Sequence, residues 1–181
     1  MRPQTSLSTS PSAGVSPGLS PGLFALALAA LSACAAPQQR SQASAAEVGQ
    51  VLDGFHQAAS KCDLDGYFRH FSASGVFLGT DATEHWTREE FRAFCAPYFA
   101  RGQGWTYTPT TRSVGFSSAG DVAWFDELLH NEKYGEVRGS GVLVRCAGAW
   151  WIEQYVMSFT VPNELAGRWL EVRRSAETPA R

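Results

Sequence analysis

Residues 121–162 have the sequence DVAWFDELLHNEKYGEVRGSGVLVRCAGAWWIEQYVMSFTVP, which predicts three long β-strands joined by two turns. In a strand, its first part would place Trp124, Asp126, Leu128 and His130 on one face and Ala123, Phe125, Glu127 and Leu129 on the other, and β-branched and aromatic residues dominate the remainder. Turn residues including Gly135 separate the first two strands, and an Ala-Gly pair closes the second hairpin. Gly139 and Gly141 indicate a sharp bend. The stretch therefore predicts a bent antiparallel sheet that needs a cover on one face.

The cover is expected from helices that precede this stretch. Apolar residues at i, i+3, i+4 and i+7 spacing over residues 47–61 predict an amphipathic helix with one buried stripe. Thr87 and Glu90 form a capping box that starts another helix, and a shorter helix is expected after Asp63. Further strands are expected over residues 75–79 and 105–116. This order predicts an α+β fold in which helices cover an antiparallel sheet.

The composition indicates one packed domain with a processed end. The 181 residues are 44% hydrophobic and 12% aromatic, which is enough for a substantial core. The 15 basic and 17 acidic residues give a formal net charge of −2, and no basic cluster is visible. This balance argues against a nucleic-acid partner and against electrostatic attachment to anionic lipid.

The first 33 residues resemble a secretory signal peptide, because a Ser, Pro and Gly-rich start precedes a short apolar run. At the end of this segment, residues 31–34, LSAC, resemble the bacterial lipobox. This resemblance implies diacylglycerol attachment to the Cys34 sulfur and cleavage just before it. Ala35 is not the Asp that favours inner-membrane retention, so the outer membrane is expected in a Gram-negative cell. An ordinary secretory signal, with Cys34 incidental, is the alternative.

Four segments are expected along the chain. They are a signal peptide (1–33), a lipidated Cys with a flexible tether (34–46), a folded domain (47–174) and a disordered tail (175–181). Near the end of the domain, apolar residues after Pro162 predict a short helix or an arm that packs back on the sheet. The lipid anchor is the one expected contact with a membrane.

The phrases FHQAASKCDLDGYFRHF, GVFLGTDATEHWTREEFRAF, GWTYTP, DVAWFDELL, RGSGVLVR and WWIEQYVMSF carry a family resemblance. Their order resembles the SnoaL-like branch of the nuclear-transport-factor-2-like superfamily over roughly residues 47–165. The resemblance implies a cone: about three N-terminal helices packed on a strongly curved antiparallel sheet around an apolar pocket, often in a homodimer. Ketosteroid isomerase, scytalone dehydratase, polyketide cyclases and limonene epoxide hydrolase share this cone, while other members only bind or dimerise. The resemblance therefore leaves the activity open.

A catalyst in such a cone needs a carboxylate or histidine in a dry pocket. Asp126 and Glu127 are the candidate general bases, and because they are adjacent on a strand only one can face the pocket. We favour Asp126, since Trp124 on the same face is a suitable lining residue. Tyr107 or His130 could polarise a substrate oxygen. The alternative is that both acids lie at the rim or pair with buried cations such as Arg138 or Arg112.

Aromatic and neutral polar residues are the candidate ligand-binding groups. Trp105 and Trp124 suit a flat or apolar ligand, and strict alternation along the last strand places Gln154 and Ser158 on the inner face. The same alternation places Trp151, Glu153, Tyr155 and Met157 on the outer face, as a dimer surface.

Neither a metal nor another cofactor is expected. Asp81, Glu84 and His85 form a polar cluster without a recognised ligand spacing, and we interpret His56 and His70 as surface or capping residues. Cys62, Cys95 and Cys146 could form one disulfide with one free thiol, or be small buried residues.

These features predict an exported, lipid-anchored protein that binds a small apolar or aromatic molecule. Two alternatives stay open. One is cofactor-free isomerase, dehydratase, cyclase or hydrolase chemistry based on Asp126 or Glu127, and the other is a dimerising module whose cone is filled by its own side chains.

Overall fold

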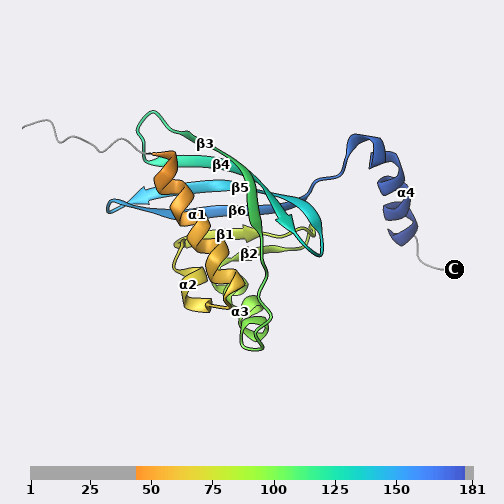
Figure 1. The fold of residues 1–181 in the computed structure, drawn as a ribbon, viewed down its shortest axis with the longest axis horizontal. Helices are drawn as coiled ribbons and strands as arrows, with labels where there is room; N and C mark the ends of the chain where they lie inside the picture. Colours follow the sequence, from red (N-terminus) through yellow and green to blue (C-terminus); the bar gives the residue numbers. More distant parts are fainter. Residues whose placement is uncertain (1–43, 178–181) are drawn as a thin grey trace, which may run out of the picture. The chain divides into compact units, whose positions relative to one another are not determined.

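The structure is a computed structural model that describes residues 44–177. Its elements are α1 (Ala45–Ser60), α2 (Leu64–Phe68), β1 (Phe71–Leu78), β2 (His85–Thr87), α3 (Arg88–Phe99), β3 (Thr108–Phe116), β4 (Val122–Asn131), β5 (Gly135–Cys146), β6 (Ala149–Phe159), the 3-10 helix η1 (Asn163–Leu165) and α4 (Ala166–Glu177) (Figure 1). The expected signal peptide, lipidated Cys34 and most of the tether lie outside the described residues. Across residues 44–177, no helix combines the length and apolar character needed to cross a bilayer.

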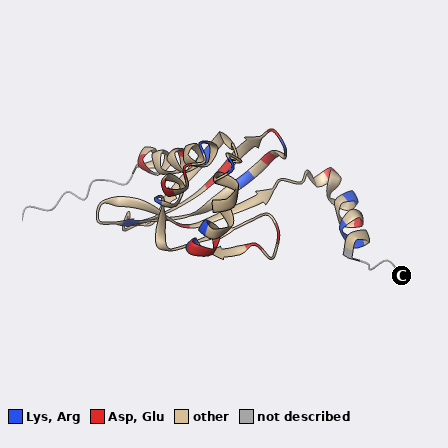
Figure 2. Cartoon of the chain, turned by 90° about the horizontal axis from the view of Figure 1, so that it is seen from below, with Lys and Arg blue, Asp and Glu red and all other residues tan. Residues whose placement is uncertain are grey.

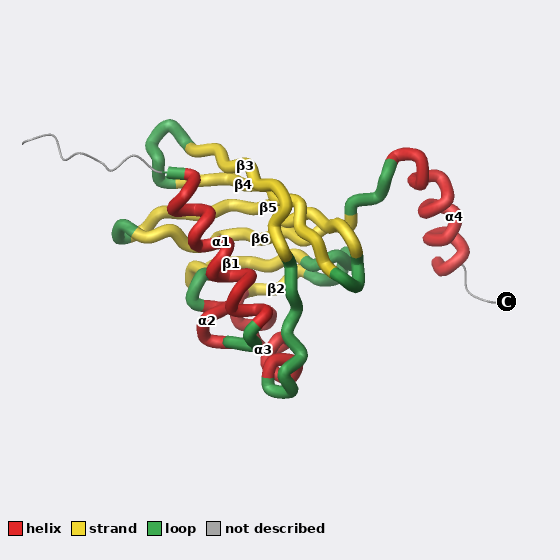
Figure 3. The backbone as a smooth tube through the Cα atoms, viewed as in Figure 1, coloured by secondary structure: helices red, strands yellow, loops and turns green. Residues whose placement is uncertain are grey.

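One curved sheet of six strands has the order β2-β1-β6-β5-β4-β3 (Figure 3). Neighbouring strands are antiparallel except for β1 and β6, which run parallel. The three strands predicted from residues 121–162 are β4, β5 and β6, and β5 lies between the other two. The α+β class and the curved sheet are therefore confirmed.

Capping boxes start helices α1 and α3. Thr87 accepts a hydrogen bond from the Glu90 amide and the Glu90 carboxylate accepts one from the Thr87 amide, as predicted. Ser44 and Glu47 make the same reciprocal pair at the start of α1. Helix α1 lies across one face of the sheet, which we call the inner face (Figure 1). Its side chains buried there are Val48, Leu52, Phe55, His56, Ala58 and Ala59.

Aromatic rings fill much of the space between the helices and the inner face. Phe77 of β1 stacks on Phe91 of α3 with ring centroids 3.9 Å apart. Phe55 of α1 stacks on Tyr67 of α2 at 4.3 Å. The first pair joins α3 to the sheet, and the second joins α1 to α2.

A β-bulge interrupts strand β6. Val142 of β5 pairs with Gln154, but the next residue, Leu143, pairs with Ile152, so Glu153 is an extra residue in β6. The strand therefore does not keep one alternation of faces along its length.

The bulge overturns the faces predicted for β6. Tyr155 is 0% exposed and Met157 is 7% exposed, and both belong to the core on the inner face. Gln154 and Ser158 therefore point to the opposite face, which corrects the prediction that they line the pocket. The reason is physical: an inserted residue exchanges the faces of every side chain that follows it.

The last helix, α4, is longer than the short helix or arm expected after Pro162. Helix α4 extends to Glu177, past the Ser175 at which the tail was expected to begin. Its apolar residues Trp169, Leu170 and Val172 are 47%, 41% and 64% exposed, so they are not packed in the core.

Figure 2 shows basic and acidic residues interspersed along the described elements.

Candidate functional site

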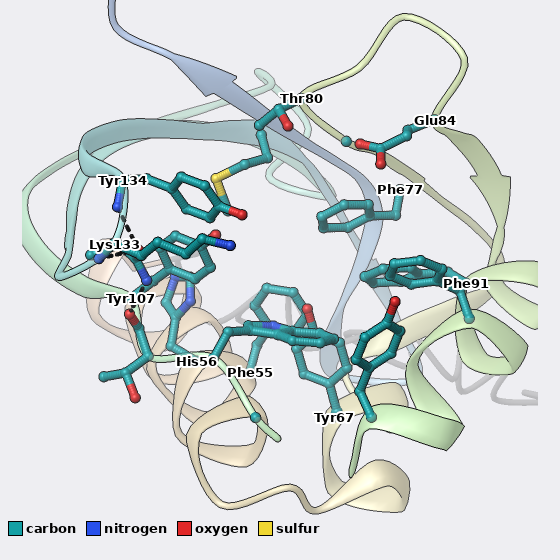
Figure 4. Close-up of a pocket in the computed structure, with 18 of the residues that line it drawn as sticks. Phe55, His56, Tyr67, Phe77, Thr80, Glu84, Phe91, Tyr107, Lys133 and Tyr134 are labelled. Atoms are coloured by element: carbon teal, nitrogen blue, oxygen red, sulfur yellow. Dashed lines mark hydrogen bonds between the residues drawn. The ribbon is translucent and has the colours of Figure 1, made fainter. Parts of the chain in front are cut away.

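A cavity of about 780 Å³ opens between the helices and the inner face of the sheet (Figure 4). Its inner wall is aromatic and comes from several elements: Phe55, Tyr67, Phe77, Trp86, Phe91 and Trp105. Its mouth is formed by exposed lining residues: Thr80, His130, Glu132, Lys133 and Tyr134. The volume lies within the range of about 300–1,000 Å³ that is usual for small-molecule sites.

A buried carboxylate stands behind this wall. Glu127 of β4 is 0% exposed, and its Oε1 lies 2.8 Å from Nε2 of His56. The Tyr155 hydroxyl donates to the same oxygen at 2.9 Å. Arg112 holds Oε2, with both Nε and Nη2 at 2.7 Å. Oε1 thus accepts hydrogen bonds from two donors, while Oε2 accepts one from Arg112 Nε and forms an ion pair with the same guanidinium.

The position of Arg112 follows from strand pairing. Arg112 of β3 lies directly opposite Glu127 in the β3–β4 register. Its Nη1 donates to the Gly49 carbonyl of α1 at 3.2 Å, and its Nη2 lies 2.9 Å from Asp53 Oδ1. The guanidinium therefore links helix α1 to the sheet beside Glu127.

Gly139 makes room for the Tyr155 hydroxyl. It is paired with Glu127 across β4 and β5. A methyl group at Gly139 would lie 2.1 Å from Tyr155 Oη, which is too short for the present arrangement, and a tight 3.1 Å from Glu127 Oε1. The absence of a side chain at this position is therefore what allows the phenol to reach the carboxylate.

The protonation states of this cluster follow from burial and charge. Burial acts to raise the Glu127 pKa, but the hydrogen bonds and charges of His56 and Arg112 outweigh it, so this pKa lies below its ordinary value. Burial and the Glu127 charge raise the pKa of Tyr155. Glu127 is therefore an anion and Tyr155 a neutral donor. Because a carboxylate only accepts, the Nε2 of His56 is the donor in their bond.

His56 connects the buried cluster with the cavity. Its side chain is 6% exposed and lines the cavity, while Nε2 is committed to Glu127. Among residues 44–177, no group hydrogen-bonds its other ring nitrogen, Nδ1. In the neutral imidazole Nδ1 is therefore a free acceptor, available to a ligand or a proton.

The structure places the two candidate acids on opposite faces, as their adjacency requires. Glu127 points inward, while Asp126 is exposed on the outer face with Trp124, which is 53% exposed. The preference for Asp126 as the inward acid and for Trp124 as a lining residue is therefore corrected. The pairing of Glu127 with Arg112 matches one of the alternatives left open from the sequence.

The other candidates divide between the cavity and the surface. Trp105, Tyr107 and His130 line the cavity, which is compatible with the roles predicted for them. Gln154 and Ser158 do not line it. Burial raises the pKa of Tyr107, and neighbouring Tyr134 adds to this effect, so the Tyr107 hydroxyl is a neutral donor.

His56 is the residue that sequence reasoning missed. It was interpreted as a surface or capping histidine, yet it follows Val48 and Leu52 at four-residue intervals on the buried stripe of α1. That spacing was the available signal.

Neither a metal cluster nor a disulfide is seen in the described part of the chain. No group of three or more His, Cys, Asp or Glu side chains within residues 44–177 could hold a metal ion. The thiols there are free: Cys95 is buried, Cys62 half-buried and Cys146 exposed.

A sequence profile of the SnoaL-like domain matches residues 48–162. The chain belongs to the SnoaL-like domain family. A comparison of this SnoaL-like chain with curated proteins finds no match. The matched region spans α1 to the end of β6, and therefore includes His56, Glu127 and the cavity.

Solved structures share the fold of this SnoaL-like domain. A Nostoc punctiforme protein of unknown function with a cystatin-like fold superposes with a TM-score of 0.56 at 15% identity, covering 66% of this chain and 95% of that one. A nuclear-transport-factor-2-like protein of unknown function from Pseudomonas putida gives 0.55 at 16% identity, covering 66% and 88%. A Streptomyces avermitilis protein described as a putative dehydratase of the same superfamily gives 0.53 at 16% identity, covering 65% and 96%. At these identities the likeness concerns the fold alone.

Proposed function

We propose that this protein binds a small, flat apolar or aromatic molecule in its cavity, with His56 contacting a polar group of that molecule. The observation that carries the proposal is an imidazole held by a buried carboxylate at the wall of an aromatic cavity of about 780 Å³. Contact with the half-buried rings of Trp86 and Trp105, which line the cavity, would hold the flat body of the ligand. A cavity of this size favours a binding protein over a cone filled by its own side chains.

A thermal-shift screen of the full chain against flat apolar and aromatic metabolites tests the proposal. A ligand at about 100 times its Kd should add about 2.7 kcal/mol to the free energy of unfolding. His56→Gln keeps a donor for Glu127 but removes Nδ1, so it should weaken the hits. His85→Gln is the matched control, because His85 is exposed and does not line this cavity. Equal stabilisation of both variants would contradict the role of His56.

Cofactor-free acid–base catalysis is the second candidate, and the bond from His56 to Glu127 is the observation that favours it. A carboxylate that holds Nε2–H orients the ring and stabilises the imidazolium that forms when Nδ1 takes a proton. His56 would be the general base and Glu127 its positioning residue, in an isomerase, dehydratase, cyclase or hydrolase reaction. The test is consumption of a screened ligand by the wild type and its survival with His56→Gln, measured by chromatography. A ligand that binds and is never consumed would leave a carrier.

Export and lipid anchoring are proposed from the sequence around Cys34. The protein would be held at the outer membrane of a Gram-negative cell by acyl chains such as palmitate, with residues 34–46 as the tether. Intact-mass measurement of the membrane-extracted protein tests this. A mature chain that starts at Cys34 with a diacylglycerol addition supports the anchor, and one that starts elsewhere without it removes the anchor.

A homodimer is proposed through the outer face of the sheet. Trp124 is 53% exposed there, and an aromatic side chain with such exposure is common at interfaces. Sedimentation velocity should give twice the monomer mass for the wild type and the monomer mass for Trp124→Lys. A monomeric wild type would contradict the proposal.

A further inference from the structure

The turn between β4 and β5 forms one side of the cavity mouth and is held in place. The Oδ1 of Asn131 accepts hydrogen bonds from the amides of Lys133 and Tyr134, each at 3.0 Å. The Nδ2 of Asn131 donates to the Thr106 carbonyl at 2.9 Å. The turn is thus fastened both to itself and to the segment that carries Trp105 and Tyr107. Its side chains are therefore presented to the cavity from a fixed backbone.

Lys133 extends from this turn over the mouth of the cavity (Figure 4). Its Nζ lies 4.8 Å from the ring centroid of Tyr134. Within residues 44–177 its ammonium forms no ion pair with a carboxylate. Lysine is rare in this chain, which contains only Lys61 and Lys133. The cavity therefore has an ammonium group at its mouth that is not ion-paired with any carboxylate of residues 44–177.

Two phenols accompany this ammonium group. Tyr107 and Tyr134 both line the cavity, and the raised pKa of Tyr107 keeps its hydroxyl a neutral donor at neutral pH. Of the acids that line the cavity, Glu84 accepts from the Asp81 amide at 3.2 Å, in the loop between β1 and β2. Glu132 is exposed beside Lys133 in the turn. An anion beside Lys133 would thus meet one cation and two hydroxyl donors, with the carboxylates of Glu84 and Glu132 also on the cavity lining.

We propose that the ligand is an aromatic carboxylate whose ring lies in the aromatic part of the cavity and whose carboxylate pairs with Lys133 at the mouth. This inference rests on the proposed binding function and names the chemical class of its ligand. The ring would lie between Phe77 and Trp105, and Tyr107 or Tyr134 would donate to the second carboxylate oxygen. Lys133 would then select among flat ligands by charge.

Two probes that share a naphthalene ring but differ in charge test the proposal. Naphthalene-2-carboxylate and naphthalene-2-carboxamide would be titrated into the full chain, free of detergent, and followed by tryptophan fluorescence, because Trp86 and Trp105 line the cavity. The wild type should bind the carboxylate about five-fold more tightly than the amide, as expected for a partly exposed ion pair. The preference should decrease as the salt concentration rises.

Charge variants assign that preference to one residue. Lys133→Met should abolish the preference, because it weakens binding of the carboxylate more than binding of the amide, and Lys133→Arg should retain it. Lys61→Met is the matched control, since it removes the other lysine, which is exposed at the end of α1, and it should behave as the wild type.

The outcomes separate this inference from the function on which it rests. Binding of both probes with equal affinity, or a preference that survives in Lys133→Met, overturns the inference and leaves the binding function standing. Binding of neither probe by the wild type overturns the inference and counts against the binding function. An equal loss of preference in Lys61→Met and Lys133→Met would show a general charge effect and also overturn the inference.

Discussion

Gly139→Ala is the substitution that tests the buried cluster most directly. The added methyl group would lie 2.1 Å from Tyr155 Oη and 2.8 Å from Tyr155 Cζ, so the phenol has to move away from Glu127. A hydrogen bond to a charged group contributes about 1.5–3 kcal/mol, and overpacking a core costs about 1–3 kcal/mol. We therefore expect Gly139→Ala to lower the free energy of unfolding by about 3–5 kcal/mol, measured by urea denaturation.

A double-mutant cycle with Tyr155→Phe separates this mechanism from a general strain on β5. Tyr155→Phe alone should cost about 1.5–3 kcal/mol, because it removes the same hydrogen bond. The double variant should then cost less than the sum of the two single variants by about the energy of that shared bond. Gly167→Ala is the control, because an added methyl group there meets no atom within 4 Å. A cost of Gly139→Ala below about 0.5 kcal/mol, or additive costs in the cycle, would refute the reasoning.

The remaining predictions concern the charge pair, the core and the thiols. Arg112→Met should lower the free energy of unfolding by about 3–5 kcal/mol in urea, because it leaves the buried Glu127 anion without its cation. Since the Glu127 pKa is lowered by folding, its contribution should be present above the ordinary value of 4.5 and be lost as the pH falls below it, so Glu127→Gln should flatten the acid side of a stability profile. Phe91→Ala should cost about 3–5 kcal/mol in thermal unfolding, since Phe91 is 2% exposed and stacked in the core. In iodoacetamide mapping by mass spectrometry, exposed Cys146 should react first and buried Cys95, whose pKa burial raises, only on unfolding.

The long elements could be predicted because their signals are local. The capping box at Thr87 and Glu90 and the strands of residues 121–162 depend on neighbours within a few positions, and the structure has them at or near the predicted bounds. Strand β2, His85–Thr87, was not predicted, because three residues show no period and this strand exists only through pairing with β1. Local pattern therefore identifies long elements and misses short ones that depend on a partner.

The faces of β6 could not be derived from alternation, because the bulge at Glu153 is set by its neighbours. Ser72 and Ser74 of β1 donate hydrogen bonds to the Glu153 carboxylate, and the β1–β6 register shifts between Phe71 and Val76 at the same place. A bulge of this kind depends on contacts between residues about eighty positions apart. Without it, Tyr155 would not face Glu127, so the site itself depends on the bulge.

The glycines of β5 provide a sequence argument for deciding which of Asp126 and Glu127 points inward. The large inward residues Phe125 and Glu127 pair with Gly141 and Gly139, respectively. Glycines at alternate positions of β5 leave space on one face of the sheet. A buried side chain from β6, the strand on the other side of β5, can occupy that space. The same two glycines that indicate a bend therefore also indicate which face of β4 is inward.

The contacts of Glu127 also decide where proton chemistry would take place in this cavity. Both of its oxygens are held by buried donors and its pKa is lowered, so protonating Glu127 near neutral pH would disrupt its contacts with Arg112, Tyr155 and His56. Of these three donors only His56 lines the cavity. A proton leaving the ligand would therefore go to His56 Nδ1, and the fixed charge of Glu127 would stabilise the resulting imidazolium without itself being protonated. For a ligand that the cavity converts, as in the catalytic alternative proposed above, Glu127→Gln should weaken turnover through the ring that it orients, whereas His56→Gln should remove the base itself.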